Sequence, residues 1–136
     1  VLTNLTGADA GNYTCVITDN CGTVTSNAAA LTIIQFPVIS TQPLSRQVCA
    51  GAEIILSVVA SGSFPLTYQW KKDGIAVGTN SASITISTTS GANFGKYTCT
   101  VSNSCGEVVS DTALVAAIPA NICSTNWSWA KRAGSN

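Results

Sequence analysis

Residues that commonly carry out chemistry are scarce in this chain. Histidine is absent, which removes the commonest general base and a frequent metal ligand. The carboxylates are spread over expected turns and strands, and no pair suggests the geometry of a glycosidase. They are Asp9, Asp19, Glu53, Asp73, Glu107 and Asp111. We therefore predict no catalytic residue, no cofactor and no metal site, and we expect that the chain is not an enzyme.

Cysteine is the reactive residue that the chain does contain, in six copies. No two cysteines have the CxxC spacing of zinc or thioredoxin-like sites. Six cysteines in a chain of low charge, rich in Thr, Ser and Val, favour an extracellular, secreted or cell-surface location, where disulfides persist. The alternative is a cytosolic chain with buried thiols. Glycosylation sequons at Asn4, Asn12 and Asn126 matter only if the source is eukaryotic.

Charge and hydropathy exclude two classes of partner. Charged residues make up 9% of the chain and balance to zero, so no basic face is expected for nucleic acid. The longest apolar runs are short, such as Ile54–Leu56, so we expect no membrane insertion in this fragment.

A repeat organises the chain. The segment Asp9–Cys15 returns 84 residues later as Asn93–Cys99, and the match continues from Cys21-Gly22 to Cys105-Gly106. Two copies of one module are therefore expected, and the first is cut, as in a piece of a longer protein. The predicted domains are a truncated copy at 1–35, a complete copy at 36–118 and a tail or following domain at 119–136.

The elements that would position these residues are all short strands. Runs of Val, Ile and Thr alternate with Gly, Pro, Asn and Ser, and no segment has a helical period. Strands are expected at 38–41, 53–60, 66–71, 83–87, 96–102 and 107–116, with two more at 13–18 and 23–33. We predict an all-β antiparallel β-sandwich without helices.

Four features of the complete copy resemble an immunoglobulin-like domain. Trp70 follows the inward position Val58 by 12 residues, Ile84 and Ile86 alternate, Asn93-x-Gly95-x-Tyr97-x-Cys99 fits the family motif, and a turn covers 103–106. The resemblance implies an immunoglobulin-like sandwich in which Trp70 fills the space between two sheets and Tyr97 forms a tyrosine corner. It also implies a structural core of Val58, Trp70, Ile84, Ile86, Tyr97 and Cys99.

The cysteines depart from the family pattern. Val58 occupies the position of the usual second-strand cysteine, so we expect Cys99 to pack against Trp70 as a small apolar thiol. In the topology that the resemblance implies, Cys49 and Cys123 lie at one end of the sandwich, and we expect a disulfide between them. Cys105 would lie roughly 25 Å away at the other end, too far for a disulfide to Cys49, although it could bridge to a preceding module.

The tail suggests a source. Residues 126–135 resemble the opening of bacterial β-propeller repeats, and Val48–Gly51 and Leu66–Trp70 are similar to immunoglobulin-like modules of bacterial secreted proteins. This interpretation predicts a bacterial surface or secreted protein with tandem sandwiches followed by a propeller. The alternative is a linker that contains two stray tryptophans.

The predicted function is structural spacing and adhesion-type binding in a larger surface or secreted protein. Expected partners are neighbouring domains of the same chain and protein or glycan ligands. Candidate binding loops are 61–65 and 103–106, with Phe64, Asn103 and Ser104 as contacts. Alternatively, Phe64 covers the end of the core. Two other functions stay open: an accessory domain of a secreted hydrolase, and a fragment of a eukaryotic receptor or cell-adhesion ectodomain.

Overall fold

The computed structural model describes residues 1–87 and 91–123. The chain divides into two compact units, Val1–Gln35 (unit 1) and Phe36–Asn136 (unit 2). In the described residues, no helix has the length and hydropathy that a membrane span needs.

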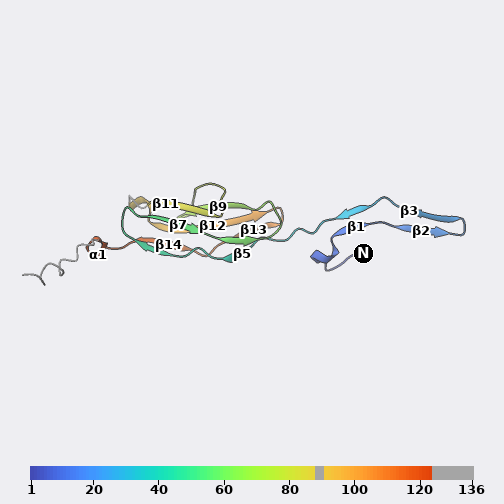
Figure 1. The fold of residues 1–136 in the computed structure, drawn as a ribbon, viewed down its shortest axis with the longest axis horizontal. Coiled ribbons are helices and arrows are strands. Elements are labelled where there is room, and N and C mark those ends of the chain that lie inside the picture. Colours follow the sequence, from blue (N-terminus) through green and yellow to red (C-terminus); the bar gives the residue numbers. More distant parts are fainter. Residues whose placement is uncertain (88–90, 124–136) are drawn as a thin grey trace, which may run out of the picture. The chain divides into compact units, whose positions relative to one another are not determined.

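One layer of unit 2 is a six-stranded sheet (Figure 1). Its strands are β6 (Arg46–Val48), β9 (Thr67–Lys72), β10 (Ile75–Val77), β12 (Gly95–Asn103), β13 (Gly106–Val109) and β14 (Ala113–Ala117). The order is β10-β9-β12-β14-β6, and β13 also pairs with β12. All pairs are antiparallel except β14 with β6. Asp73 and Gly74 connect β9 to β10 with positive φ angles, as expected for a two-residue hairpin turn.

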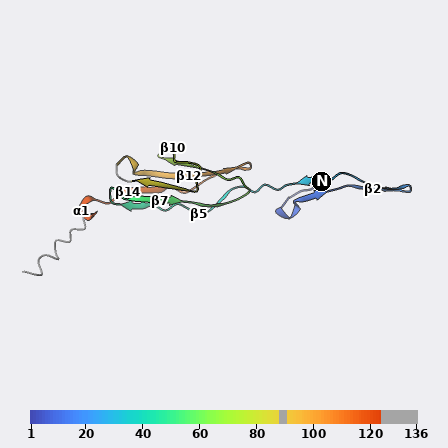
Figure 2. The same ribbon diagram turned by 45° about the horizontal axis from the view of Figure 1, so that its top comes forward.

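The other layer is built from four strands, which Figures 1 and 2 show beside the first. They are β5 (Val38–Thr41), β7 (Glu53–Ser57), β8 (Val59–Ser61) and β11 (Ser83–Ser87). The strand β7 pairs with β11, and β5 pairs with β8 through a register shift between Ile39 and Thr41.

The core of unit 2 lies between these layers. Alternate residues of each strand point inward, so β12 contributes Tyr97, Cys99 and Val101, and β9 contributes Trp70. The full buried hydrophobic set is Leu56, Val58, Trp70, Ile86, Tyr97, Cys99, Val101, Ala113 and Val115. The all-β sandwich predicted from the sequence is confirmed.

Several predicted boundaries are wrong. The strand expected at 53–60 is divided in two, because β7 pairs with β11 and β8 pairs with β5. The Val58 N–H between them donates to Ala82 O (2.9 Å), one step beyond the pair Ser57↔Ser83. The strand expected at 107–116 is likewise divided into β13 and β14. The expectation of no helices also fails, because α1 (Ala120–Cys123) follows the last strand and η2 (Gly91–Asn93) precedes β12 as a 3-10 turn.

Unit 1 consists of a 3-10 turn and two strand pairs. Its elements are η1 (Gly7–Asp9), β1 (Gly11–Tyr13), β2 (Val16–Asp19), β3 (Gly22–Thr25) and β4 (Ala29–Leu31). Each predicted long strand is again divided, so β1 pairs with β4 and β2 with β3. The pairing Tyr13↔Ala29 matches Tyr97↔Ala113 of unit 2. No residue of unit 1 is buried.

Candidate binding loops and the core that holds them

The core positions Trp70 beside Cys99. These residues face each other in the β9–β12 register, and both have 0% exposed surface. The Trp70 Nε1–H donates to Ser81 O at 3.0 Å, which gives the buried indole N–H a hydrogen-bond acceptor. Val58 and Ile86 are also buried, whereas Ile84 is partly buried against the cluster.

Cys99 is a free thiol with little reactivity. Burial raises the pKa of the Cys99 thiol to about 11. Since the thiolate is the reactive form, Cys99 stays protonated at neutral pH and acts as a packing group. Such a thiol suits a structural position and is unsuited to nucleophilic catalysis.

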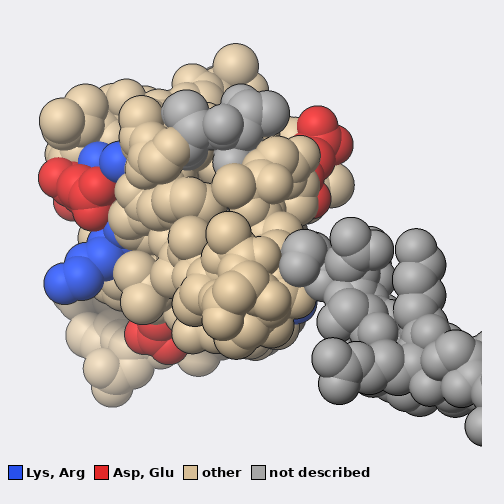
Figure 3. All heavy atoms as spheres, turned by 90° about the vertical axis from the view of Figure 1, so that its left-hand side faces the viewer, with Lys and Arg blue, Asp and Glu red and all other residues tan. Residues whose placement is uncertain are grey.

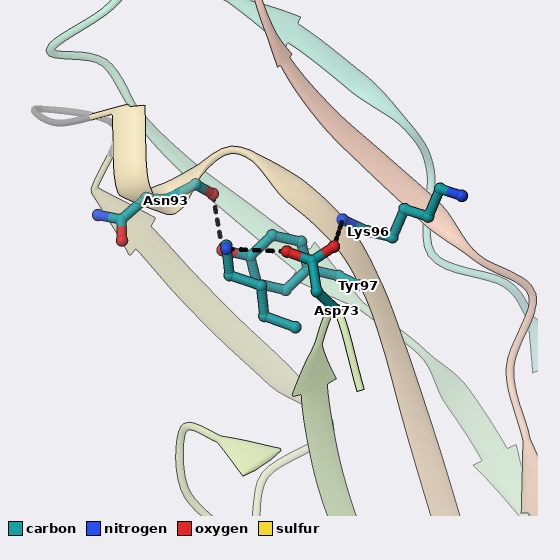
Figure 4. A network of polar contacts seen from close by, with 5 residues as sticks. Asp73, Asn93, Lys96 and Tyr97 are labelled. Carbon is teal, nitrogen blue, oxygen red and sulfur yellow. Dashed lines mark hydrogen bonds and ion pairs between the residues drawn. The ribbon is translucent and has the colours of Figure 1, made fainter. Parts of the chain in front are cut away.

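Tyr97 links the start of β12 to the turn before it. Its hydroxyl donates to Asn93 O at 2.8 Å, the geometry of a tyrosine corner, as Figure 4 shows. The Asn93 side-chain amide donates in turn to Ser87 O. Partial burial raises the pKa of Tyr97, so its hydroxyl stays a donor at physiological pH. The amide thus supplies a neutral contact at the position that Asp9 occupies in unit 1.

A carboxylate holds the β9–β10 turn against β12. Asp73 accepts from the Lys96 N–H (3.0 Å) and from Lys72 Nζ (2.9 Å), and its own N–H donates to Lys96 O (2.8 Å) (Figure 4). The Lys96 N–H, followed by the Lys72 ammonium, lowers the pKa of Asp73. A Cβ at Gly95 would come within 2.5 Å of Asp73 Oδ2, and Gly95 also has φ +154°, so this contact requires glycine.

A disulfide holds the segment that follows β14, the last strand of unit 2. The structure joins Cys49 to Cys123, with Cα atoms 5.6 Å apart and a sequence separation of 74. Cys49 follows β6 directly, and Cys123 ends α1. The Ile118 N–H also donates to Val48 O (2.9 Å), which extends the β14–β6 contact toward this bridge.

A hydrogen bond joins the two candidate loops, 61–65 and 103–106, which follow the ends of β8 and β12. The Asn103 side-chain amide donates to Ser63 O at 3.0 Å, and Asn103 Oδ1 accepts from the Cys105 N–H at 2.9 Å. Asn103 therefore holds the loops in place, while Ser104 is exposed. Phe64 is 86% exposed, so the alternative that it covers the end of the core is wrong.

Sequence reasoning missed Phe36 as part of this loop end. A Cβ at Gly106 would come within 2.5 Å of Phe36 Cε2, and Gly106 has φ +151°, so the ring lies on the bare backbone of the turn. The fully buried Pro37 follows it. An aromatic-Pro pair just before the first strand, together with a glycine in the last turn, is the signal that could have identified this contact.

The described part of the chain offers little reactive chemistry. Residues 1–87 and 91–123 contain no group of three or more His, Cys, Asp or Glu side chains that could hold a metal ion. On the face in Figure 3, charges of both signs occur in small separate groups among uncharged residues. The surface that this geometry does offer is a pair of loops, joined by the hydrogen bond from Asn103 to Ser63 O, from which the ring of Phe64 is exposed.

The comparison with protein families identifies this fold. Residues 37–103 match the family model described as "Immunoglobulin domain". Residues 37–103 are an immunoglobulin domain. The match begins at the buried Pro37 and ends at Asn103, so it contains Trp70, the tyrosine corner and both loop anchors.

Several curated animal proteins are similar to the chain. Human hemicentin-1 is 36% identical over 69 residues, covering 51% of this chain and 1% of its own length. Mouse leucine-rich repeats and immunoglobulin-like domains protein 3 is 34% identical, covering 72% and 9%, and mouse roundabout homolog 1 is 32% identical, covering 78% and 7%. The chain thus spans less than a tenth of each of these relatives.

Solved structures agree on the fold. A titin fragment of domains I67–I69 aligns with a TM-score of 0.74 and 25% identity, covering 85% of this chain and 44% of the fragment. Extracellular domains 3–5 of Drosophila OTK align with a TM-score of 0.66 and 22% identity, covering 85% and 42%. The fold of the immunoglobulin domain is therefore shared with fragments that contain several such domains.

Proposed function

We propose that this chain is a non-catalytic extracellular part of a larger multidomain protein, in which immunoglobulin domains space their neighbours and bind protein or glycan ligands. The observation that carries the proposal is the repetition of the module: unit 1 has the strand register of β12–β14 in unit 2. A truncated copy at 1–35, a complete copy at 36–118 and a tail from 119 agree with this arrangement. Residues 126–135, with the propeller resemblance, lie outside the described residues.

The disulfide supports an extracellular location. A bridge between Cys49 and Cys123 persists in oxidising compartments and is rarely maintained in the cytosol. It also attaches the segment after β14 to the domain, which suits a domain that acts as a spacer for its neighbour.

The comparisons favour one alternative over a bacterial source. The relatives named above are animal proteins, and one has both leucine-rich repeats and immunoglobulin-like domains in its name. They support a eukaryotic receptor or cell-adhesion ectodomain more than a bacterial surface protein. The reading frame of the intact gene tests this: a transmembrane helix with a cytoplasmic tail supports the ectodomain, propeller blades support the bacterial protein, and a catalytic domain supports a hydrolase accessory role.

A binding assay tests the role of the loops. The chain, immobilised on beads, is assayed against extracellular protein and glycan arrays and then compared with Phe64→Ala. Phe64 is exposed, so its removal should weaken ligand binding without unfolding the domain. Ile75→Ala is the matched control, because Ile75 is 72% exposed on β10 and lies outside both loops. Equal binding by both variants would contradict a binding role for Phe64.

A further inference from the structure

The strand β11 lies at an open edge of the second layer of unit 2. It pairs with β7 on one side, and no strand pairs with its other side among residues 1–87 and 91–123. Such an edge presents backbone N–H and C=O groups that a further strand can bind. Proteins commonly protect edge strands with charged residues, proline or a bulge. The strand β11 has the sequence Ser-Ile-Thr-Ile-Ser and a continuous register, so it has none of these protections.

The ladder with β7 shows which residues of β11 face this edge. Opposite residues in an antiparallel pair alternate between exchanging two hydrogen bonds and exchanging none. The Val58 N–H donates to Ala82 O (2.9 Å) in the same register as the ladder, so every second residue from Ala82 onward bonds to β7. The backbone groups of the residues between them point to the open edge, and these residues are Ser83, Thr85 and Ser87.

Thr85 is the centre of this edge. At one end of the strand, the Ser83 N–H donates to Ser81 Oγ at 3.3 Å. At the other end, Ser87 O accepts from the Asn93 side-chain amide. No hydrogen bond from another segment reaches the Thr85 backbone on the edge side within the described residues. The edge therefore suits one short added strand that is centred opposite Thr85.

A hollow of about 240 Å³ lies beside β11, where residues of the first layer form its other wall. Its apolar end includes Val77, Gly78 and Ile84. Gly78 lies so close to this isoleucine that a Cβ on it would come within 3.0 Å of Ile84 Cδ1. Successive side chains of a strand point to opposite faces. The inward side chains of an added strand would therefore enter this hollow.

Lys72 gives the hollow a positive charge at its other end. Tyr97 is opposite Lys72 in the β9–β12 register, and its hydroxyl reaches Asn93, whose amide binds Ser87 O. Lys72 therefore lies at the Ser87 end of β11. Its ammonium binds Asp73 at 2.9 Å and has further donors, since an ammonium carries three. A carboxylate on an added strand would complement this end.

We propose that the open edge of β11 binds an extended segment of a partner protein as an additional antiparallel strand. One residue of the segment exchanges two backbone hydrogen bonds with Thr85. The residue before it carries a carboxylate that points inward to Lys72, and the residue after it is a branched aliphatic residue that contacts Ile84. The segment thus has an acidic-x-aliphatic pattern. This site lies outside the two candidate binding loops, so it does not depend on the role proposed for them.

A peptide tests the proposal on the intact chain. The probe is acetyl-Thr-Glu-Thr-Val-Thr-amide, whose central threonine takes the place opposite Thr85. In a titration followed by amide NMR spectra, the signals of β11 should shift and those of β13 should not. N-methylation of the central threonine removes the donor that faces β11, and it should weaken binding by at least roughly tenfold. N-methylation of the valine is the matched control, because that N–H points away from β11, and it should leave binding unchanged.

Two pairs of chain variants locate the contacts. Thr85→Pro removes the edge N–H without removing a bond to β7, so it should abolish binding, whereas Thr85→Val keeps this N–H and should bind like the unsubstituted chain. Lys72→Gln should weaken binding of the probe by about two- to fivefold, and it should not affect a probe with glutamine in place of glutamate. Arg46→Gln on β6 removes the same charge elsewhere and should have no effect.

Four results would overturn the proposal. The first is an absence of shifts in β11 at the solubility limit of the probe, and the second is equal binding of the two N-methylated probes; both are independent of whether Thr85→Pro folds. The third is binding that persists in a folded Thr85→Pro variant. The fourth is a set of shifts in β11 that depends on protein concentration without any probe, because a second copy of the chain would then occupy the edge.

Discussion

Unit 1 and the β12–β14 region of unit 2 make the same local hydrogen bonds. The Tyr13 hydroxyl donates to Asp9 O at 2.8 Å, and the Tyr97 hydroxyl donates to Asn93 O at 2.8 Å. The Cys15 N–H donates to Ser26 Oγ at 2.9 Å, and the Cys99 N–H donates to Ser110 Oγ at 2.9 Å. The turn, the tyrosine corner and the interruption between paired strands therefore occur in both copies of the repeat.

Burial separates the two regions. Tyr97 is 3% exposed and Tyr13 is 42% exposed, although their hydroxyls make the same bond. Hydrogen bonds between residues a few positions apart depend on local sequence, whereas burial depends on a second layer that only unit 2 contains among the described residues. We infer that cooperative stability lies in the core of unit 2, because exposed local bonds contribute little net free energy.

The largest expected effect comes from removing the indole of that core. Trp70→Ala should lower the free energy of unfolding of unit 2 by about 3–5 kcal/mol, because it leaves a cavity between the layers. It also leaves Ser81 O without its donor. Urea unfolding followed by circular dichroism measures the loss.

Trp70→Phe is the control for this substitution, since it keeps an aromatic ring and should cost less. Equal stability of Trp70→Ala and the unsubstituted chain would show that unit 2 does not depend on its core, and the contrast between the units would disappear.

A second prediction adds a bond that the core of unit 2 lacks. Val58→Cys should form a disulfide with Cys99, because both positions are buried in one cluster and the related family pattern has a cysteine there. The bridge should raise the free energy of unfolding by about 2–4 kcal/mol. Peptide mapping identifies the pair, and urea unfolding with and without reductant measures the gain.

The unsubstituted chain, treated with the same reductant, controls for loss of the Cys49–Cys123 bridge. An introduced thiol that stays reduced, or that pairs with the exposed Cys15, would mean that the two layers do not hold positions 58 and 99 together.

These residues also show what the sequence could predict. Trp70, Tyr97 and their strands follow from alternation and from one family motif, since both are local patterns. The division at Val58 could not be predicted, because the apolar alternation continues through it while the partner strand changes from β11 to β5. The exposure of Phe64 and the packing of Phe36 on Gly106 depend on how separate loops meet, which no local pattern records.

Equivalent truncations in the two units give a direct test of the burial contrast. Val101→Ala should lower the free energy of unfolding by about 2 kcal/mol, because two fully buried methyl groups are lost. Ile17→Ala, at the equivalent and exposed position, should change stability by less than about 0.5 kcal/mol. Both are measured by urea unfolding at one pH. A comparable loss in both variants would contradict the absence of a core in unit 1.

The smallest effect concerns two carboxylates with lowered pKa values. The Lys96 N–H lowers the pKa of Asp73 in unit 2, and the Thr6 N–H lowers the pKa of Asp9 in unit 1. Ionised Asp73 therefore stabilises folded unit 2 above its ordinary pKa of 3.8, and this contribution is lost as pH falls through the lower folded value. Asp73→Asn should flatten the fall in stability below about pH 4.

Asp9→Asn provides the comparison for this pH effect. Asp9 caps an exposed turn of unit 1, where it accepts from the Thr6 N–H at 2.7 Å, so its protonation should melt only that turn. Urea unfolding between pH 2 and pH 7 should therefore give the same curve for Asp9→Asn and the unsubstituted chain. If Asp9→Asn changes this curve as much as Asp73→Asn, unit 1 unfolds together with unit 2, and cooperative stability is not confined to the core of unit 2.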